Sequence, residues 1–415
     1  MLSQLLFMAG NSLTVGGFFN YFVVQFHPSA FLMAAAMIAP ETAQSFSVLG
    51  RWIAIRSHCR KRNWIRFLIA GRIASMLLPL ALFWPPAREA NLPPLMLILI
   101  CTAVWYLFQG IAYVNYLSWL SVLVPEVNWG RLLSRRQLAG LLVSLGMPLL
   151  TVWLRQVLLK GQPGDVVRWS YSLLFIAGGL ITLASILPLV RFPEISERRF
   201  PERTPVPFSQ LTFSRSFQCL LAARWWLAFF QGLTQAVLFK YAVEILDVSL
   251  PAYTVLTSLM IALQMPMVWW AGRCSDRFQE KRALFWGMAG LSCALPFWIF
   301  ATPERWWLIA VAYAIWGGFG LINVCGQSLC LKLAPIEDNV AHLAFYEQIS
   351  GLIAGAAGLL GGYCLDQFQR GEWLWAPAFL SPVMVLLIVS WMGRLTAPLW
   401  LIPIQQPVRE LSSGQ

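Results

Sequence analysis

Apolar stretches about as long as a membrane-spanning helix recur from one end of this chain to the other. A helix needs about 20 mostly apolar residues to cross a hydrocarbon core of ~30 Å. Of the 415 residues, 58% are hydrophobic and only 12% are charged, whereas a soluble domain carries about 25% charged residues. The pattern predicts an all-α polytopic membrane protein, with the lipid bilayer as its main solvent.

Twelve spans can be delimited, and the connections between them are short with one exception. Segment 191–216 is rich in Pro, Arg and Glu, so it cannot bury apolar area and is predicted to be a solvated linker. It divides the chain into an N-terminal six-helix bundle (1–190), a C-terminal six-helix bundle (217–400) and a tail (401–415). The predicted spans are 4–26, 30–49, 64–84, 94–123, 137–158, 170–190, 217–243, 250–271, 284–301, 306–334, 344–366 and 373–396.

Basic residues are distributed unevenly between the two sides of this topology. With a cytoplasmic N-terminus, the inner loops and tail hold 21 of the 30 Lys and Arg, the outer loops hold 6, and the spans hold 3. This bias follows the positive-inside rule and predicts that both termini are cytoplasmic. Arg72 and Arg224 are expected to snorkel to the inner surface, and Lys240 is expected to pair with Glu244. Short loops favour a plasma membrane of the bacterial inner-membrane type.

The distribution of charge and the spacing of cysteine and histidine argue against other classes of protein. The net charge of +12 comes from clusters between apolar runs rather than from a stripe on a soluble face, so we expect no nucleic-acid partner. The eight cysteines are scattered without metal or disulfide spacing, and there are three histidines. We therefore expect no metal and no cofactor. The chain has no cluster of catalytic groups, and we expect it not to be an enzyme.

The two halves resemble each other at matching loops. The loop after span 2 (50–62) and the loop after span 8 (272–282) both begin with Gly-Arg and end in adjacent basic residues. The loops after spans 4 and 10 (124–126 and 334–337) echo each other around a Pro and a Glu. Duplicated six-helix halves are a known transporter architecture.

The loop after span 8 carries the most specific motif of the chain. It reads Gly-x-x-x-Asp-Arg-x-x-x-Lys-Arg and resembles the G-x-x-x-D-R-x-G-x-[RK]-[RK] loop of the major facilitator superfamily, with Gln279 in place of the inner glycine. The first-half copy is degraded, with Ala54 at the aspartate position and Ile55 at the arginine position. Segment 124–136 resembles the loop 4–5 segment of bacterial members. The resemblance implies a solute transporter of two pseudo-symmetric six-helix bundles with twelve transmembrane helices.

In that family the motif loop acts as a cytoplasmic gate. An aspartate beside an arginine at a helix end can form charge-assisted hydrogen bonds that hold neighbouring helix ends together. Loss of the acid in the first half implies an asymmetric gate, and it leaves open a non-transporting receptor or assembly factor on the same scaffold. The predicted gate residues are Gly272, Asp276, Arg277, Lys281, Arg282 and Arg131.

The resemblance also implies a central cavity lined by spans 1, 4, 7 and 10. Amides on three of these spans lie about halfway across, at 1.5 Å per residue, and aromatic and polar side chains accompany them at helical spacing. Such side chains either line a cavity or form interhelical hydrogen bonds. Without a charge at this depth, the lining predicts an uncharged polar or amphiphilic solute. The predicted cavity residues are Asn11, Tyr106, Gln109, Tyr113, Gln231, Gln235, Trp316, Asn323 and Gln327.

Two carboxylates are candidates for proton coupling. Glu41 follows Pro40 in the middle of span 2, and Glu347 lies near the start of span 11, where a gate contact is the alternative. Together these features predict a monomeric secondary transporter that moves a small-molecule solute by rocker-switch alternating access, with protons as the candidate coupling ion.

Overall fold

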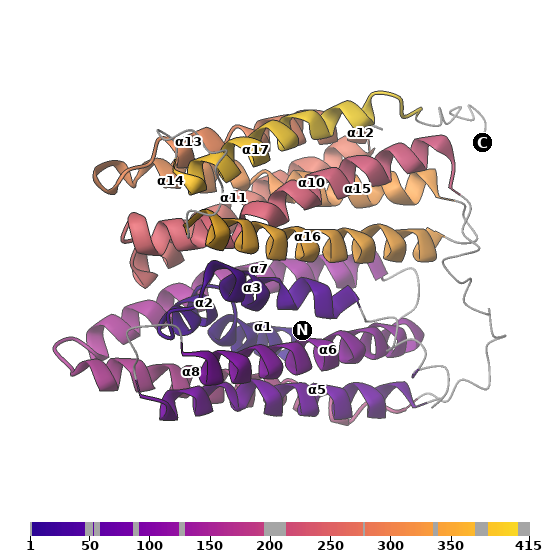
Figure 1. The fold of residues 1–415 in the computed structure, drawn as a ribbon. Helices are drawn as coiled ribbons and strands as arrows, with labels where there is room; N and C mark the ends of the chain where they lie inside the picture. Colours follow the sequence, from indigo (N-terminus) through magenta and orange to yellow (C-terminus); the bar gives the residue numbers. More distant parts are fainter. Residues whose placement is uncertain are drawn as a thin grey trace.

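The computed structural model describes residues 2–45, 53, 59–85, 91–123, 129–194, 213–276, 279–334, 339–369 and 381–405. For helical residues 41, 43–45, 117–118, 121–123, 129–135, 137–138, 275–276 and 339–341 it describes the backbone and not the side chains. The described secondary structure is entirely helical. The helices lie side by side in two stacked groups, one from each half of the chain (Figure 1).

Each predicted span of the N-terminal half corresponds to one helix or to two consecutive ones. The elements are α1 (Leu2–Thr14) with α2 (Gly17–Val24), α3 (Ala30–Ser45), α5 (Arg60–Met76) with η1 (Leu78–Phe83), α6 (Leu92–Leu123), α7 (Trp129–Leu158), and α8 (Gly164–Ala184) with α9 (Leu187–Val190).

The C-terminal half repeats this pattern. Its elements are α10 (Arg215–Lys240) with η4 (Tyr241–Ile245), α11 (Leu250–Asp276), α12 (Glu280–Ser292) with α13 (Leu295–Ile299), η5 (Pro303–Arg305), α14 (Leu308–Trp316) with α15 (Phe319–Leu333), α16 (Asn339–Gln369), and α17 (Pro382–Thr396) with η7 (Ala397–Leu401).

Within the described residues, nine helical segments are long and apolar enough to cross a membrane. The remaining predicted spans are the first, second and seventh. The first is divided at Val15 and Gly16, where Gly16 has a φ of 64°, a left-handed conformation that glycine adopts without steric cost. The second is described only as far as Ser45, and the seventh contains charged side chains. The count of twelve therefore stays a prediction.

Several helices extend beyond the apolar stretch that predicted them. α7 begins at Trp129 rather than 137, α8 at Gly164 rather than 170, and α16 at Asn339 rather than 344. Helices continue past the hydrocarbon because water solvates their polar ends, and an apolar window does not detect these turns. α10 begins at Arg215, two residues inside the predicted linker, because the Ser214 hydroxyl caps it and accepts from the Phe217 N–H at 3.2 Å.

The predicted linker and the start of span 12 fall largely outside the described residues. Positions 195–212 and 370–380 are not described, so the domain boundaries at 190, 216 and 400 stay predictions. α17 begins at Pro382, where Ser381 caps the helix by accepting from the Met384 N–H at 3.3 Å.

α3 and α16 pack closely where the two halves meet (Figure 1). Glycines on α16 make the close approach possible: a Cβ on Gly362 would lie 2.6 Å from the Ala30 carbonyl oxygen, and one on Gly355 would lie 2.2 Å from a Thr42 methyl carbon. Small residues allow helix backbones to approach in this way within a membrane. The packing is intramolecular.

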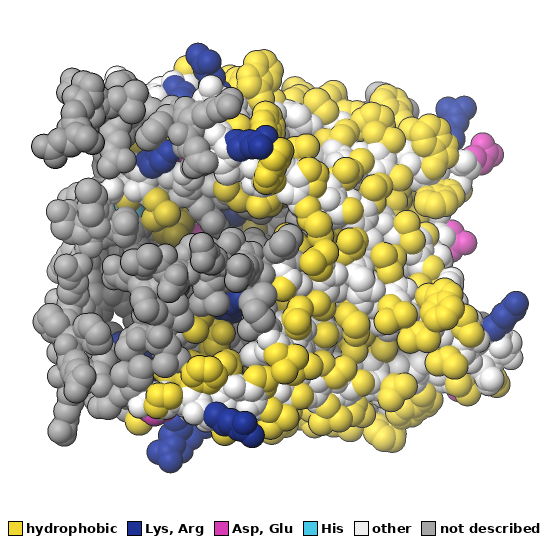
Figure 2. All heavy atoms as spheres, turned by 180° about the vertical axis from the view of Figure 1, so that it is seen from behind, with side chains coloured by type: hydrophobic (Ala, Val, Ile, Leu, Met, Phe, Trp, Pro, Cys, Tyr) yellow, Lys and Arg dark blue, Asp and Glu magenta, His cyan; other side chains and the backbone are white. Residues whose placement is uncertain are grey.

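The helix ends form two ends of the molecule. We call the end where α5, α10 and α12 begin the inner end, predicted to be cytoplasmic, and the opposite end the outer end. Hydrophobic side chains cover the middle of one face, and charged side chains gather at the two ends (Figure 2). Exposed tryptophans near both ends match the aromatic belts of membrane proteins. They are Trp84, Trp153, Trp169, Trp306 and Trp307 at the outer end and Trp226, Trp269, Trp270, Trp286 and Trp400 nearer the inner end.

Candidate functional site

A fully buried arginine lies at the centre of the N-terminal half. Arg72 is 12 residues into α5, about 18 Å from the start of the helix. Its Nη2 donates to Asn11 Oδ1 on α1 at 2.9 Å and to Gln109 Oε1 on α6 at 2.8 Å. Trp105 Nε1 donates to the same Gln109 oxygen at 3.1 Å. Arg72 therefore links two predicted cavity residues, Asn11 and Gln109, and joins helices α1, α5 and α6.

The expectation that Arg72 snorkels to the inner surface is wrong. α5 begins at Arg60 rather than at 64, so Arg72 lies deeper than the predicted span placed it. The guanidinium carbon lies 5.5 Å from the centre of the Phe7 ring and 5.1 Å from that of Trp105, and these contacts with aromatic faces favour a cation. The expectation of an uncharged solute depended on the absence of a charge at this depth, and that premise is also wrong.

A second cluster joins α10, α15 and α16 in the C-terminal half. Arg224 Nη2 lies 3.4 Å from Glu347 Oε2, and Gln327 Nε2 donates to Glu347 Oε1 at 3.1 Å. The Arg224 guanidinium lies 5.6 Å from the centre of the Tyr346 ring. Arg224 therefore pairs with Glu347 rather than extending to the surface as predicted. The predicted residues Gln327 and Glu347 are neighbours.

A third cluster, nearer the inner end of the N-terminal half, was not predicted. Arg136 on α7 donates to Gln4 Oε1 on α1 through Nη2 at 2.7 Å and through Nε at 3.3 Å. Its guanidinium lies 5.0 Å from the centre of the Tyr116 ring on α6. The available signal was the spacing of Gln4 and Asn11, which are two helical turns apart and so share one face of α1.

Polar faces on α6 and α15 change from buried to exposed toward the inner end. Thr102, Tyr106, Gln109 and Tyr113 follow one another on one face of α6; the first two are buried, Gln109 is partly exposed, and Tyr113 is 55% exposed. On α15, Gly320 is buried, whereas Asn323 and Gln327 are exposed. One turn further along α6, Tyr116 is again partly buried, with its ring centre 5.1 Å from that of Trp64.

The remaining predicted cavity residues described here do not form a common cluster. Gln231 and Gln235 on α10 are partly exposed, and the Gln231 Nε2 is buried without a hydrogen-bond acceptor. Tyr106 stacks on Trp105 with ring centres 4.5 Å apart. Trp316 stacks on Trp298 at 5.9 Å. These two aromatic side chains contribute to packing, and their predicted role in a cavity stays a prediction.

Contacts between the halves close the outer end. The Asp366 carboxylate on α16 accepts from the backbone N–H of Ala30 at 2.7 Å and of Phe31 at 2.9 Å, where a negative charge suits the N-terminus of α3. The Tyr21 hydroxyl donates to the Val248 carbonyl.

Lys240 adds to this closure. Its Nζ lies 3.2 Å from Glu244 Oε1, which confirms the predicted ion pair, and it also donates to the Pro28 carbonyl oxygen at 3.2 Å. The predicted local pair is therefore linked to the other half of the molecule.

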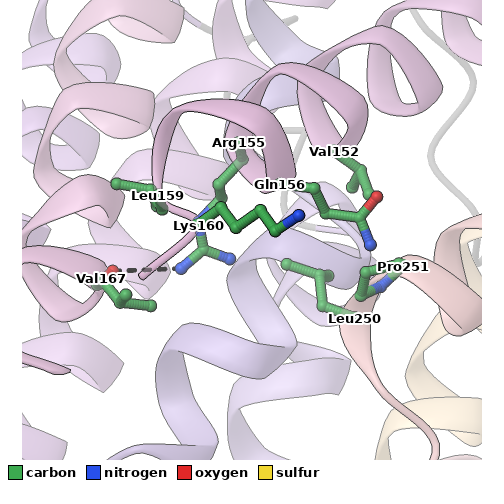
Figure 3. A pocket seen from close by; sticks show the side chains of 8 residues that line it. All are labelled: Val152, Arg155, Gln156, Leu159, Lys160, Val167, Leu250 and Pro251. Atoms are coloured by element: carbon green, nitrogen blue, oxygen red, sulfur yellow. Dashed lines mark hydrogen bonds between the residues drawn. The ribbon is translucent and has the colours of Figure 1, made fainter. Parts of the chain in front are cut away.

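A small crevice also lies at the outer end, between α7, the start of α8 and the start of α11 (Figure 3). Its volume of about 210 Å³ is below the ~300–1,000 Å³ of typical ligand sites. Arg155 is engaged within its own half, where Nη2 donates to the Val167 carbonyl at 3.1 Å. We do not assign the solute site to this crevice, which is lined by Val152, Arg155, Gln156, Leu159, Lys160, Val167, Leu250 and Pro251.

Part of the predicted gate lies outside the described structure. The Asp276 and Arg131 side chains and the whole of Arg277 are not described. Gly272 is partly buried on α11, with nothing within 4 Å of a Cβ placed on it, and Arg282 is exposed. The gate role of these residues stays a prediction.

Lys281 binds within its own half. Its Nζ donates to the Ile402 carbonyl at 2.8 Å and to the Ile404 carbonyl at 2.7 Å. In the first half, Lys61 Nζ donates to the Val190 and Phe192 carbonyls at 2.7 and 2.6 Å. The matching loops noted in the sequence thus make matching contacts with the end of the sixth span of each half.

A buried acid next to the motif was missed by sequence reasoning. Glu280, in the first turn of α12, is fully buried and forms an ion pair with Lys332 on α15. Ser328 Oγ donates to the same carboxylate at 3.3 Å. The signal was its place directly before the basic pair, at a helix N-terminus that favours an acid. Across the described chain, no group of three or more His, Cys, Asp or Glu could hold a metal ion.

Comparison with known proteins settles the family. The sequence profile of the Major Facilitator Superfamily matches residues 1–339 and 226–414 in two overlapping stretches. The chain belongs to the major facilitator superfamily. No curated protein matches the sequence.

Solved structures of the superfamily share the fold over nearly the whole length. A variant of the nucleoside transporter NupG is 12% identical and covers 98% of each chain with a TM-score of 0.68. The D-xylose-proton symporter is 14% identical over 97% of this chain and 95% of its own, with a TM-score of 0.68. The inward-open xylose transporter XylE from E. coli is 15% identical over 99% and 96%, with a TM-score of 0.64. At these identities the likeness concerns the fold alone.

Proposed function

We propose that this chain is a secondary transporter that carries a small polar solute across a membrane by rocker-switch alternating access. The observation that carries the proposal is the set of polar side chains on α1, α6, α10 and α15, which correspond to spans 1, 4, 7 and 10. On α6 and α15 their exposure increases toward the inner end, from Thr102 to Tyr113 and from Gly320 to Gln327. Cross-half bonds of Asp366, Lys240 and Tyr21 gather at the outer end. This combination suits a state that is open to the inner side.

We further propose protons as the coupling ion, with Glu347 as the acceptor. Its side chain is 38% exposed and forms bonds with Arg224 and Gln327, so its exposure can change when the helices move. Glu41, the first candidate from the sequence, has a side chain outside the described residues and becomes the alternative. The chain is proposed to act as a monomer in a plasma membrane of the bacterial inner-membrane type, with both termini cytoplasmic.

Flux into reconstituted vesicles tests the transport function. The purified chain in liposomes is incubated with a mixture of polar metabolites, and the vesicle contents are analysed by mass spectrometry against protein-free liposomes. We expect protein-dependent accumulation that increases with an imposed proton gradient. Binding of a solute to the purified protein without any flux would instead favour the receptor or assembly-factor alternative.

A further inference from the structure

We propose that Arg72, together with Asn11 and Gln109, forms the subsite for a carboxylate on the transported solute. This inference rests on the proposed transport function and specifies its substrate class. Arg72 is fully buried, and the described residues include no carboxylate in an ion pair with it. Ionisable side chains within a membrane protein interior mark substrate or ion pathways because burying them unpaired is costly.

The hydrogen-bonding capacity of the guanidinium is incompletely used. Nη2 donates to the two amide oxygens, whereas Nε and Nη1 are buried without an acceptor. An arginine has donors and no acceptor, so the missing partner must supply lone pairs. A carboxylate oxygen supplies them together with the missing negative charge, and a bond between the two ions is stronger than one between neutral groups.

The two amides make the surroundings donor-rich. Their oxygens face Arg72, so their NH₂ groups point away from it, an orientation that the hydrogen-bond network itself assigns. Both Asn11 and Gln109 are partly exposed, so a solute can reach the cluster at these two residues. On the opposing half, Gln231 has a buried Nε2 without an acceptor. Donors from both halves suit a solute rich in acceptors.

The balance of charge on the inner part of the bundle also favours an anionic ligand. In the three arginine clusters, Arg72, Arg136 and Arg224 contribute three cations against one acid, Glu347, and the Glu280–Lys332 pair adds one charge of each sign. Arg72 lies about 18 Å from the start of α5, deeper than the headgroup of a lipid in the inner leaflet. The expected ligand is therefore a dissolved anion that enters the bundle.

Arg394 provides a matched control. It is also buried, on α17, but its Nη2 donates to Thr234 Oγ1 at 2.7 Å and to the Phe230 carbonyl at 3.2 Å, and its Nε donates to Ser390 at 3.1 Å. None of its nitrogens is buried without an acceptor. Arg394 therefore shares the burial of Arg72 without its unused donors.

The test compares carboxylates with the corresponding carboxamides, such as nicotinate with nicotinamide and benzoate with benzamide. Thermal unfolding of the purified full-length protein is measured with each compound at constant ionic strength, because a ligand of the folded state raises its apparent stability. We expect carboxylates to raise the Tm and their amides to leave it unchanged. Arg72→Gln should weaken carboxylate binding at least tenfold and Arg72→Lys less. Arg394→Gln should lower the Tm while keeping the preference for carboxylates.

The inference is overturned if no pair discriminates in the wild-type protein, or if Arg72→Gln keeps the wild-type preference. Vesicle flux separates this failure from failure of the transport function. Uptake of an uncharged solute that is unaffected by Arg72→Gln leaves transport standing and removes the carboxylate subsite. Carboxylate binding that depends on Arg72, without flux of any solute, keeps the subsite and removes transport.

Discussion

At the scale of single residues, Glu347 receives bonds from two helices, from Arg224 on α10 and from Gln327 on α15. Glu347→Gln removes the charge and keeps one of the two acceptor oxygens, so it can still accept from one of the two partners. Because only a carboxylate can exchange a proton, we expect this variant to fold and insert normally. Uptake driven by a pH gradient should fall at least about tenfold, equivalent to ~1.4 kcal/mol. Vesicle uptake measured with and without the gradient provides the test.

Glu244→Gln is the matched control for this substitution. Glu244 is a partly exposed carboxylate that pairs with a basic residue, Lys240, but it lies at the outer end. Its replacement can change the rate of uptake through the outer-end contacts of Lys240, but it should leave the dependence of uptake on the proton gradient unchanged. If Glu347→Gln transports like the wild type at every gradient, Glu347 is not the coupling residue and Glu41 becomes the candidate.

Sequence reasoning located individual polar residues better than their partners. The Lys240–Glu244 pair was predictable because it depends only on helical spacing, and it is present. Arg72 was misplaced because its depth depends on where α5 begins and its contacts depend on the packing of α5 against α6. At Gly71, a Cβ would lie 3.1 Å from the Trp105 carbonyl oxygen. Such an approach between residues distant in sequence has no local signal.

At the scale of secondary structure elements, Lys61 and Lys281 tie the start of the third span of each half to the end of the sixth. Each amine donates to two backbone carbonyls, and hydrogen bonds from charged groups contribute about 1.5–3 kcal/mol when shielded from water. Both lysines are partly exposed, so we expect Lys281→Met to cost about 1–2 kcal/mol. A lower Tm of the purified Lys281→Met protein would show this loss of stability. Lys61→Met should have a similar effect.

The exposed neighbour Arg282 supplies the control, since Arg282→Met removes a charge at the same helix end. Its effect on the Tm should be small. The lysines lie in different halves without a shared partner, so the double variant should show nearly additive losses. An unchanged Tm in both lysine variants would mean that these contacts contribute nothing to stability.

The positions of the elements were largely predictable, and their ends were not. Each predicted apolar span contains a described helix, because lipid requires long apolar surfaces, whereas the short helices η5 and η7 lie outside the predicted spans. The division of the first span at Gly16 depends on backbone conformation, and the early start of α8 lies in a segment that contains Asp165 and Arg168. Hydropathy contains no information on either feature.

At the scale of the whole molecule, closure of the outer end depends in part on the bonds from Asp366 to the first N–H groups of α3. Asp366→Asn keeps one acceptor oxygen and loses the charge, so the closed outer end should be destabilised by about 1–2 kcal/mol, a shift of about five- to thirtyfold in the equilibrium. Spin labels at Lys160→Cys and Glu304→Cys, exposed positions in opposite halves, should show a larger population of long outer-end distances. Asp165→Asn, at an exposed outer-end acid within one half, should leave the distances unchanged.

The same outer-end distances can be measured in a variant of the predicted inner gate, for which we expect the opposite change. Asp276 is the last residue of α11 and belongs to the motif 272–282. If the superfamily's gate operates here, Asp276 stabilises the state that is closed at the inner end. Asp276→Asn should therefore insert normally and shift the protein toward the inward-open state, shortening the outer-end distances that Asp366→Asn lengthens. In the double variant the two shifts should partly cancel, because both act on one equilibrium between two states. Opposite changes from acids at opposite ends would establish alternating access. Changes of the same sign would show that the two ends do not share one rocking motion.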